Sequence, residues 1–561
     1  MQLQPPRFRR LPSKPDPAMG FCKCARRMFR RAHFVFWLAL LPGILAGCSR
    51  PEPPADLTII NSVEPESLDP AIIVAQADMR VVQGLFEGLT RLEPVQARAV
   101  PGLAQNWEIS SDGLTYTFHL RPNLKWSTGG GISSTDVVYS WIRALKPQTA
   151  SRYAGQLYYL TNAEAFNAGS IKNPDLVGVH AVDPLTVRVQ LHSPTAFFLD
   201  LCAFPTLAVV PRQWIEKYGD HWLTHQPLPV SGAYELAEWR LNDRIRLVKN
   251  PNYWDAAHTR SRVIDFLPVG SASTALNLYM SGQADVVWDK SMIPSQLLDL
   301  LLKRPDFHSF GYLGTYFIRF NTTRKPFDDP RVRQALALAV DKDWIVKKIT
   351  RAGEKTTSHL VPDGTRDYTS PEGLGHDVAR ARQLLAEAGY PGGRGFPRFE
   401  YLFDGSAGAG GNIHESIALE LQQMWREALG IQMDLRQVET QVFWGMQSRL
   451  DYTLARSSWI ADYDDANTFL GMFVTGDGNN ETGWGNPRYD SLVHEANQTV
   501  DPLKREHLFQ QAETILIRDA VPIIPLYIYV GVNYFDTNKV RGIYENVLDD
   551  HPLQWIVKVK K

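Results

Sequence analysis

The sequence has few cysteines, and their positions exclude the cross-links that stabilise many exported proteins. Of the four cysteines in 561 residues, only Cys48 and Cys202 lie beyond residue 47. If Cys48 carries a lipid, Cys202 has no partner for an internal disulfide. Two separated cysteines also cannot provide the four ligands of a structural zinc site. The chain must therefore rely on its hydrophobic core, which a protein of this length can build.

A basic surface and a membrane-spanning run are missing as well. The first 47 residues hold nine Lys/Arg and one Asp, so the remaining chain carries 50 basic and 59 acidic side chains, a net charge of −9. Such a chain is poorly suited to bind a nucleic-acid backbone, and we expect no nucleic-acid partner. The apolar run of residues 34–45 is well short of the ~20 residues that cross a bilayer, so we expect it to be cleaved.

The amino-terminal segment has the features of a bacterial lipoprotein signal. Four arginines precede the apolar run, which ends at Leu45-Ala46-Gly47-Cys48. Small residues before the cysteine suit a signal peptidase, and the Cys48 thiol would carry the lipid. We expect residues 1–47 to be removed, with Met28 as a start of ordinary length, and residues 48–55 to form a proline-rich tether. This predicts a membrane-anchored lipoprotein of the cell envelope or periplasm. The alternative is a buried helix that ends in a cysteine.

Enzyme signatures begin in the sequence but are not completed. His414-Glu415 starts like the helix of a zinc protease, but residue 418 is Ala where the second histidine ligand belongs. Ser406 is not part of a nucleophile elbow, because Asp404 stands where that motif has glycine. We therefore expect no catalytic residue, no metal and no cofactor. An envelope hydrolase or a cell-wall adhesion protein is the alternative class.

Alternating strand and helix patterns predict an α/β protein of two or three lobes. Ser133 with Asp136 forms a capping box, and Asp329-Pro330 marks a second helix start. Strict alternation around an Asp-Gly turn predicts a hairpin. The predicted strands include residues 57–60, 107–110, 114–120 and 431–435, and the predicted helices include those starting near 134 and 330 and those at 378–388 and 413–429.

The run from Arg456 to Tyr463 combines a guanidinium, an extended apolar and aromatic segment, and a carboxylate. Such a run can pair its main chain with an extended ligand, while Asp462 receives an α-amino group and Arg456 a carboxylate. On local chemistry alone, a solvated turn at Asp462 before a helix capped by Asp464 or Asp465 is the simpler interpretation.

Several stretches together resemble one family, the periplasmic oligopeptide- and dipeptide-binding lipoproteins of bacterial ABC importers, which are extracellular solute-binding proteins of the peptide/nickel type. The resemblance runs almost end to end. In addition to the run from Arg456, it rests on residues 66–70, 85–89, 107–126, 136–141, 232–234, 250–254, 326–336 and 384–390.

The resemblance implies an α/β fold of the two-lobed periplasmic-binding-protein type II, with an additional inserted domain and the ligand enclosed between the lobes. Lobe I would consist of residues 56–98, 226–309 and 528–561. The additional domain would comprise residues 99–225, and lobe II residues 310–527.

The resemblance also implies a set of binding residues from both lobes. These are Asp462 for the ligand's α-amino group; Ser458 and Trp459, opposite Val74, Ala75 and Gln76, for its main chain; Arg456 and His414 for its carboxylate; and Tyr153 and Trp288 for the aromatic cavity.

The sequence departs from a close oligopeptide-binding relative at four positions. Gln447 replaces a second arginine, Gly314 and Ile460 replace a bridging cysteine pair, and Thr440 replaces a pocket tryptophan. The second carboxylate contact, the disulfide and the relative's side-chain preference therefore do not carry over.

We expect a monomeric solute-binding receptor that captures short peptides in extended form, closes its lobes over them, and delivers them to a permease with its ATPase subunits. The alternative function keeps the fold and exchanges the peptide for a nickel chelate, haem, sugar or opine.

Overall fold

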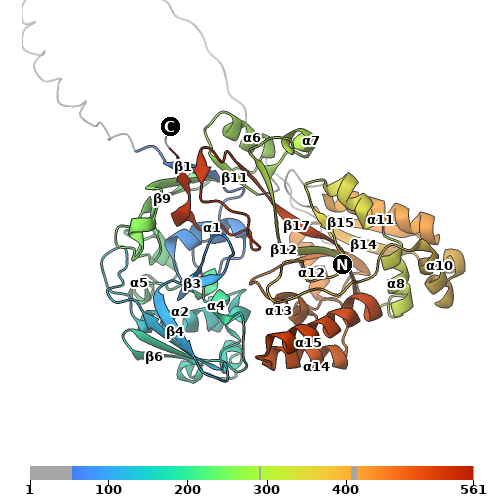
Figure 1. The fold of residues 1–561 in the computed structure, drawn as a ribbon, viewed down its shortest axis with the longest axis horizontal. Coiled ribbons are helices and arrows are strands. Elements are labelled where there is room, and N and C mark those ends of the chain that lie inside the picture. The colour runs from blue at the N-terminus through green and yellow to red at the C-terminus, as the bar shows by residue number, and fades with distance from the viewer. Residues whose placement is uncertain (1–52, 290–291, 406–412, 560–561) are drawn as a thin grey trace, which may run out of the picture. The chain divides into compact units, whose positions relative to one another are not determined.

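Two long antiparallel strands, β12 (Phe307–Phe320) and β17 (Ile523–Phe535), form the centre of a large mixed sheet (Figure 1). The computed structural model describes residues 53–289, 292–405 and 413–559. Within these residues, eleven strands form one sheet in the order β15-β14-β16-β12-β17-β11-β1-β10-β9-β8, with β13 paired to β17. The remaining strands of this sheet are β15 (Met433–Val438), β14 (Phe399–Asp404), β16 (Leu454–Ile460), β11 (Val286–Trp288), β1 (Leu57–Ile60), β10 (Val263–Leu267), β9 (Arg244–Lys249), β8 (Tyr234–Arg240) and β13 (Lys355–Thr356).

Parallel pairs occur in both halves of this sheet, which confirms the predicted α/β class. β1 is parallel to β10 and β11, and β14 is parallel to β15 and β16. Parallel neighbours need a crossover connection. Helix α11 (Ile413–Leu429) provides it between β14 and β15, and its Leu421 and Trp425 are completely buried in the adjoining core.

A second, four-stranded antiparallel sheet belongs to the segment predicted as the additional domain. Its order is β4 (Ala104–Ile109), β5 (Thr115–Leu120), β7 (Thr186–Gln190) and β6 (Val179–Asp183), and helix α2 (Ser134–Leu145) shares its core. β4 and β5 form the predicted hairpin. The predicted capping box is present, because the Ser133 N–H donates to the Asp136 carboxylate at 2.9 Å.

The sheet strands β12 and β17 pass from one hydrophobic core to another. Phe307 and Tyr534, near one end of this strand pair, lie in a core with β11, whereas Tyr316 and Tyr527 lie in the core that contains α11. The boundaries predicted at 309/310 and 527/528 fall inside these continuous strands. The exact domain limits therefore remain a prediction.

Most helix limits agree with the sequence prediction. Helices α8 (Pro330–Leu338), α10 (Val378–Glu387) and α11 lie where they were expected. The segment predicted as lobe II also contains α12 (Thr440–Ser448), α13 (Asn467–Leu470), α14 (Pro487–Gln498) and α15 (Pro502–Thr514). Gln76, the last of the three predicted binding residues 74–76, is the first residue of helix α1 (Gln76–Leu85).

Within the described part of the chain, no helix is both long and apolar enough to cross a membrane. The same residues contain no group of three or more His, Cys, Asp or Glu side chains that could hold a metal ion. Cys202 is buried and free. The predicted signal peptide and the lipidated Cys48 lie outside the described residues.

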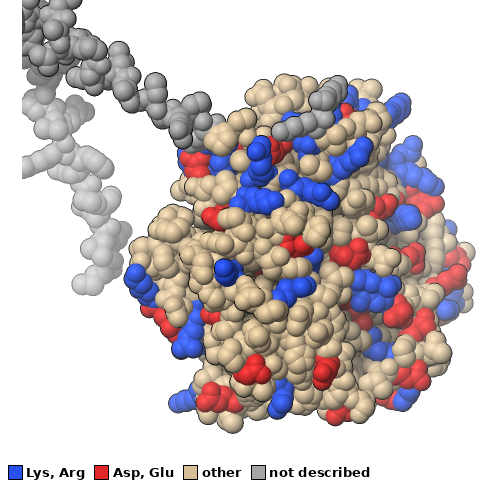
Figure 2. Space-filling view, turned by 60° about the vertical axis from the view of Figure 1, so that its left-hand side comes forward, with Lys and Arg blue, Asp and Glu red and all other residues tan. Residues whose placement is uncertain are grey.

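Figure 2 shows one face of the molecule, on which Lys/Arg and Asp/Glu side chains are interspersed among uncharged regions.

Candidate functional site

One edge of β16 is open to an extended ligand. The strand pairs with β12 over its whole length, with Gly314 opposite Ile460, but with β14 only at its first two residues. The Ala461 N–H donates to the Leu313 carbonyl at 2.8 Å. Because main-chain groups alternate in direction along a strand, those of Ser458 and Ile460 point away from β12. An added strand can pair with them.

Asp462 follows this edge and has an uncharged partner. Its Oδ2 accepts a hydrogen bond of 2.8 Å from Nε2 of Gln156, which lies in the additional domain. Burial raises the pKa of Asp462 to about 7, although the hydrogen bond from Gln156 acts to lower it. A positive charge placed next to this carboxyl group would therefore stabilise its ionised form.

Two cavities share Asp462, Tyr153 and Tyr463 in their walls. The first has a volume of about 240 Å³, and residues of α1 and of the loop before it, Val74 and Gln76 among them, also line it. The second, of about 730 Å³, includes Trp459. The structure thus brings six of the ten predicted binding residues to these cavities or to the edge of β16: Asp462, Trp459, Ser458, Val74, Gln76 and Tyr153. Ala75, exposed and extended in backbone, stands between Val74 and Gln76.

The side chains of Trp459 and Ser458, two residues of the segment predicted to bind the ligand's main chain, already have hydrogen-bond partners within the protein. The Trp459 Nε1–H donates to Thr468 Oγ1 at 3.2 Å, and the Ser458 side chain hydrogen-bonds to the Tyr529 hydroxyl. These contacts fix the position of the strand through its side chains. They do not involve the main-chain groups that point away from β12.

Arg456, a predicted carboxylate ligand, already binds a carboxylate of the protein. Its Nη2 lies 2.6 Å from Asp404 Oδ1, and its guanidinium lies 4.7 Å from the ring centre of Phe443. Gln447 donates its side-chain amide to the Arg456 carbonyl at 3.0 Å. A ligand carboxylate would therefore have to share this guanidinium with Asp404.

The other two predicted residues are buried. His414, in the first turn of α11, has Nδ1 3.2 Å from the Tyr316 hydroxyl and stacks on that ring. Trp288 is 2% exposed at the end of β11, and it is not among the residues that line the cavities at Asp462. The guanidinium of Arg80 lies 5.7 Å from its ring centre.

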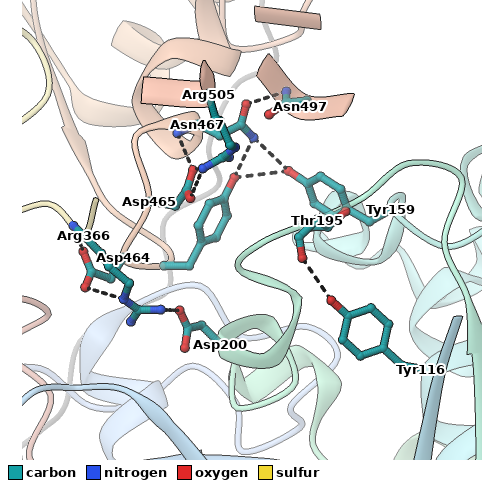
Figure 3. Close-up of polar contacts among 11 residues, drawn as sticks. Tyr116, Tyr159, Thr195, Asp200, Arg366, Asp464, Asp465, Asn467, Asn497 and Arg505 are labelled. Carbon is teal, nitrogen blue, oxygen red and sulfur yellow. Dashed lines mark hydrogen bonds and ion pairs between the residues drawn. The ribbon is translucent and has the colours of Figure 1, made fainter. Parts of the chain in front are cut away.

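Ion pairs join the segments predicted as the additional domain and lobe II (Figure 3). Arg366 forms ion pairs with Asp200 of the additional domain at 2.8 Å and with Asp464 at 3.3 Å. The ring of Tyr463 stacks on Phe197 with 3.9 Å between ring centres. Sequence reasoning missed this interface, because Arg366 and Asp200 are 166 positions apart and follow no periodic pattern.

Two acidic residues of this interface do more than the predicted helix cap. Asp465 accepts a 2.8 Å hydrogen bond from the Asn467 N–H, as a capping residue does, and it also forms an ion pair with Arg505 at 2.6 Å. Asp464 is committed to Arg366. The cap expected at Asp464 or Asp465 is thus present at Asp465, although both carboxylates are buried and paired. Asp462, where the solvated turn was expected, is half-buried and accepts a hydrogen bond from Gln156.

Two of the sequence motifs that carried the family resemblance meet in a buried network outside the cavities. Glu87 accepts hydrogen bonds from the Tyr253 hydroxyl and, at 2.6 Å, from Trp254 Nε1. Arg91 lies 2.8 Å from Asp255. These motif residues join segments of lobe I and so serve the fold.

The continuous sheet, the additional domain and the cavity walls contributed by separate cores define a two-lobed substrate-binding protein. Residues 98–481 match the model of bacterial extracellular solute-binding proteins, family 5 Middle. The chain is 34% identical over 482 residues to the periplasmic oligopeptide-binding protein OppA of Salmonella typhimurium, covering 84% of this chain and 86% of that protein. It is also 34% identical to the probable deoxycholate-binding periplasmic protein YgiS of Escherichia coli, covering 83% and 86%.

Among solved structures, the periplasmic oligopeptide-binding protein OppAIV of Borrelia burgdorferi superposes with a TM-score of 0.78 at 31% identity, covering 90% of this chain and 99% of that chain. The chain therefore belongs to the family 5 bacterial extracellular solute-binding proteins, and its fold is the two-lobed type II binding-protein fold with an inserted domain.

Proposed function

We propose that this chain is the solute-binding receptor of an ABC importer and that it captures short peptides in extended form. The observation that carries this proposal is the open edge of β16 leading directly to Asp462, a carboxylate with an uncharged partner. A strand edge binds any peptide main chain, and a carboxylate at its end binds the α-ammonium group. Neither contact depends on the ligand's side chains, so broad sequence tolerance follows.

The ligand would lie between the edge of β16 and the loop that precedes α1. Ser458, whose main chain points away from β12, would pair with the peptide on one side, and Val74 and Ala75 on the other. Trp459 would line the cavity beside it, with Gln76 at the helix start and Tyr153 against the ligand's side chains. Trp288 would not contact the peptide directly but would hold Arg80, a residue of the cavity wall, in position. Arg456 and His414 would act on a carboxylate only for ligands long enough to reach them.

Contacts from both lobes are what would favour closure. A ligand shifts a conformational equilibrium only when it binds the two states differently. Residues 74–76 belong to the proposed lobe I and residues 458–462 to lobe II, so an enclosed peptide contacts both. The long strands β12 and β17, which connect the two cores, are the natural place for the bending that closure needs.

We further propose that the receptor works in the periplasm as a monomer anchored through a lipid on Cys48, and that it delivers its ligand to a permease with ATPase subunits. Support comes from the sequence pattern that ends at Cys48 and from the periplasmic location in the names of both relatives described above. Binding without catalysis is the expected activity, because no nucleophile with an adjacent base was found in the sequence.

A bile salt is the second candidate ligand, because one relative carries that description. The cavity at Asp462 argues against it here. Its walls hold Asp200, Asp462, Asp549 and Asp550 but only one basic residue, Arg80. An anionic steroid would place its carboxylate among aspartates, which is electrostatically unfavourable.

Native mass spectrometry of the purified protein, followed by calorimetry with defined tripeptides and with deoxycholate, tests the proposal. We expect co-purified masses that fit a mixture of peptides, and binding of tri-alanine. A single non-peptide mass, or deoxycholate binding with no tripeptide binding, would overturn it.

A further inference from the structure

The smaller cavity at Asp462 contains three carboxylates that are each held by an uncharged amide. Asp462 accepts from Gln156 Nε2 at 2.8 Å and Asp550 from Gln83 Nε2 at 3.3 Å. Asp549 accepts from Asn533 Nδ2 at 3.3 Å. Amide donors fix the direction of a carboxylate but do not neutralise its charge.

The basic groups near these carboxylates compensate little of the charge. The fourth aspartate of the cavity, Asp200, is paired with Arg366. Arg80 lines the cavity, but its Nη1 approaches the Asn61 side chain and the Trp288 carbonyl, both at 3.5 Å. His551 has Nε2 3.1 Å from Asp549 and carries a charge only when it is protonated. Aspartates therefore outnumber basic side chains in the cavity wall, four to one.

The titration behaviour of the carboxylates is consistent with this excess. Burial raises the pKa of Asp550, and the neighbouring Asp549 charge raises it further, while His551 and Gln83 act to lower it. The pKa of Asp462 is raised for the same primary reason, burial. Carboxyl groups with a raised pKa gain stabilisation when a cation comes close.

Apolar side chains also line this cavity. Met79, Leu92 and Phe204 line the same cavity of about 240 Å³. Long basic side chains lay their methylene stems on apolar surfaces while the charged end reaches a polar partner. The cavity thus has apolar surface for the methylene stem of a lysine or arginine side chain and carboxylates for its charged end.

We propose that this cavity selects peptides with a basic side chain at the first or second residue, the α-ammonium group binding Asp462 and the side-chain cation binding Asp549 and Asp550. This inference rests on the proposed peptide-binding function and adds a preference that main-chain pairing cannot supply. Charge-assisted hydrogen bonds in a partly buried site discriminate strongly between charged and neutral partners.

Calorimetry with matched tripeptides tests the preference. Lys-Ala-Ala and Ala-Lys-Ala are compared with the same peptides carrying norleucine, which keeps the stem and lacks the charge. We expect the lysine peptides to bind about tenfold more tightly in low salt, with a smaller difference in high salt. Equal affinities of the lysine and norleucine peptides would overturn the inference.

Variants place the effect at the two aspartates. In Asp549→Asn/Asp550→Asn the lysine preference should fall to less than about twofold while tri-alanine still binds, since Asn tolerates the positive φ of 50° at Asp549. Asp519→Asn, an exposed acid of the 515–520 helix, is the matched control and should keep the preference. A preference that persists in the double variant would overturn the assignment, and Asp550→Asn alone serves if the double variant does not fold.

The two proposals fail in different ways. If the folded wild-type protein binds no tripeptide, including tri-alanine, the proposed function is wrong and the inference falls with it. If tri-alanine binds and the lysine peptides bind no better than the norleucine ones, only the inference is wrong.

Discussion

The side-chain amide of Gln156 donates a hydrogen bond of 2.8 Å to the Asp462 carboxylate, across 306 positions of sequence. The contact connects the additional domain to the segment that follows β16. It satisfies the geometry of the carboxylate without supplying a positive charge, which leaves the pKa of Asp462 at about 7. A peptide ammonium would supply the missing charge.

Replacing Asp462 by Asn should separate binding from folding. Losing one partner of an enclosed charge pair costs about 3–5 kcal/mol, so we expect the Kd for tri-alanine to rise at least about hundredfold by calorimetry. Asp519→Asn should leave the Kd unchanged. Unchanged affinity in Asp462→Asn would remove Asp462 from the site.

The same Asp462→Asn variant should be more stable than the wild type when no ligand is present. The pKa of Asp462 is raised in the folded protein, so its ionisation costs stability as pH rises toward and through about 7. We expect the gain in Tm to be larger at pH 8 than at pH 5. A gain that is larger at pH 5 would contradict the raised pKa.

Peptide affinity should increase with pH up to about 7. Below this pH the free protein holds a proton on Asp462, and binding an ammonium group must release it. Affinity should therefore fall by up to about tenfold per pH unit in the acid range, while the peptide's own amino group stays protonated. Calorimetry at pH 6 in two buffers of different ionisation enthalpy measures the released proton. Asp462→Asn should release none, and an affinity that is flat from pH 5.5 to 7.5 would refute the linkage.

Blocking the two ends of a peptide should have unequal effects. Asp462 has an uncharged partner, whereas Arg456 already pairs with Asp404 at 2.6 Å. N-acetylation of a tripeptide should therefore abolish measurable binding, whereas C-terminal amidation should weaken it by less than about tenfold. If amidation costs as much as acetylation, Asp404 must release Arg456 when the peptide binds.

Arg366 should stabilise the interface between the additional domain and lobe II. Its side chain is 24% exposed, and its partners Asp200 and Asp464 are 4% and 7% exposed. Arg366→Met would leave two buried carboxylates without a cation, and we expect the free energy of unfolding in urea to fall by about 3 kcal/mol. Asp200→Asn in that background should restore part of the loss. Arg436→Met breaks an exposed ion pair with Glu400 and should change the free energy of unfolding little. Equal losses in Arg366→Met and Arg436→Met would contradict the role of burial at Arg366.

Local features were predictable because their causes are local. The capping box at Ser133 and Asp136 and the limits of α10 and α11 follow from neighbouring residues, and the structure confirms them. Asp462 and Trp459, named as binding residues from the resemblance, both line the larger cavity, and their role in binding stays a prediction. Gln156, Arg366 and Asp549 were missed, because each acts on a partner from a distant segment.

The sequence by itself determined the α/β class, the places of the main helices and hairpin, and the family. These properties depend on residue type and on spacing within a segment. Only the tertiary structure decided which charges are compensated. Arg456 is neutralised by Asp404 and Asp200 by Arg366, whereas Asp462 and Asp550 have amide partners. Charge compensation depends on distances between segments that the chain brings together only when it folds.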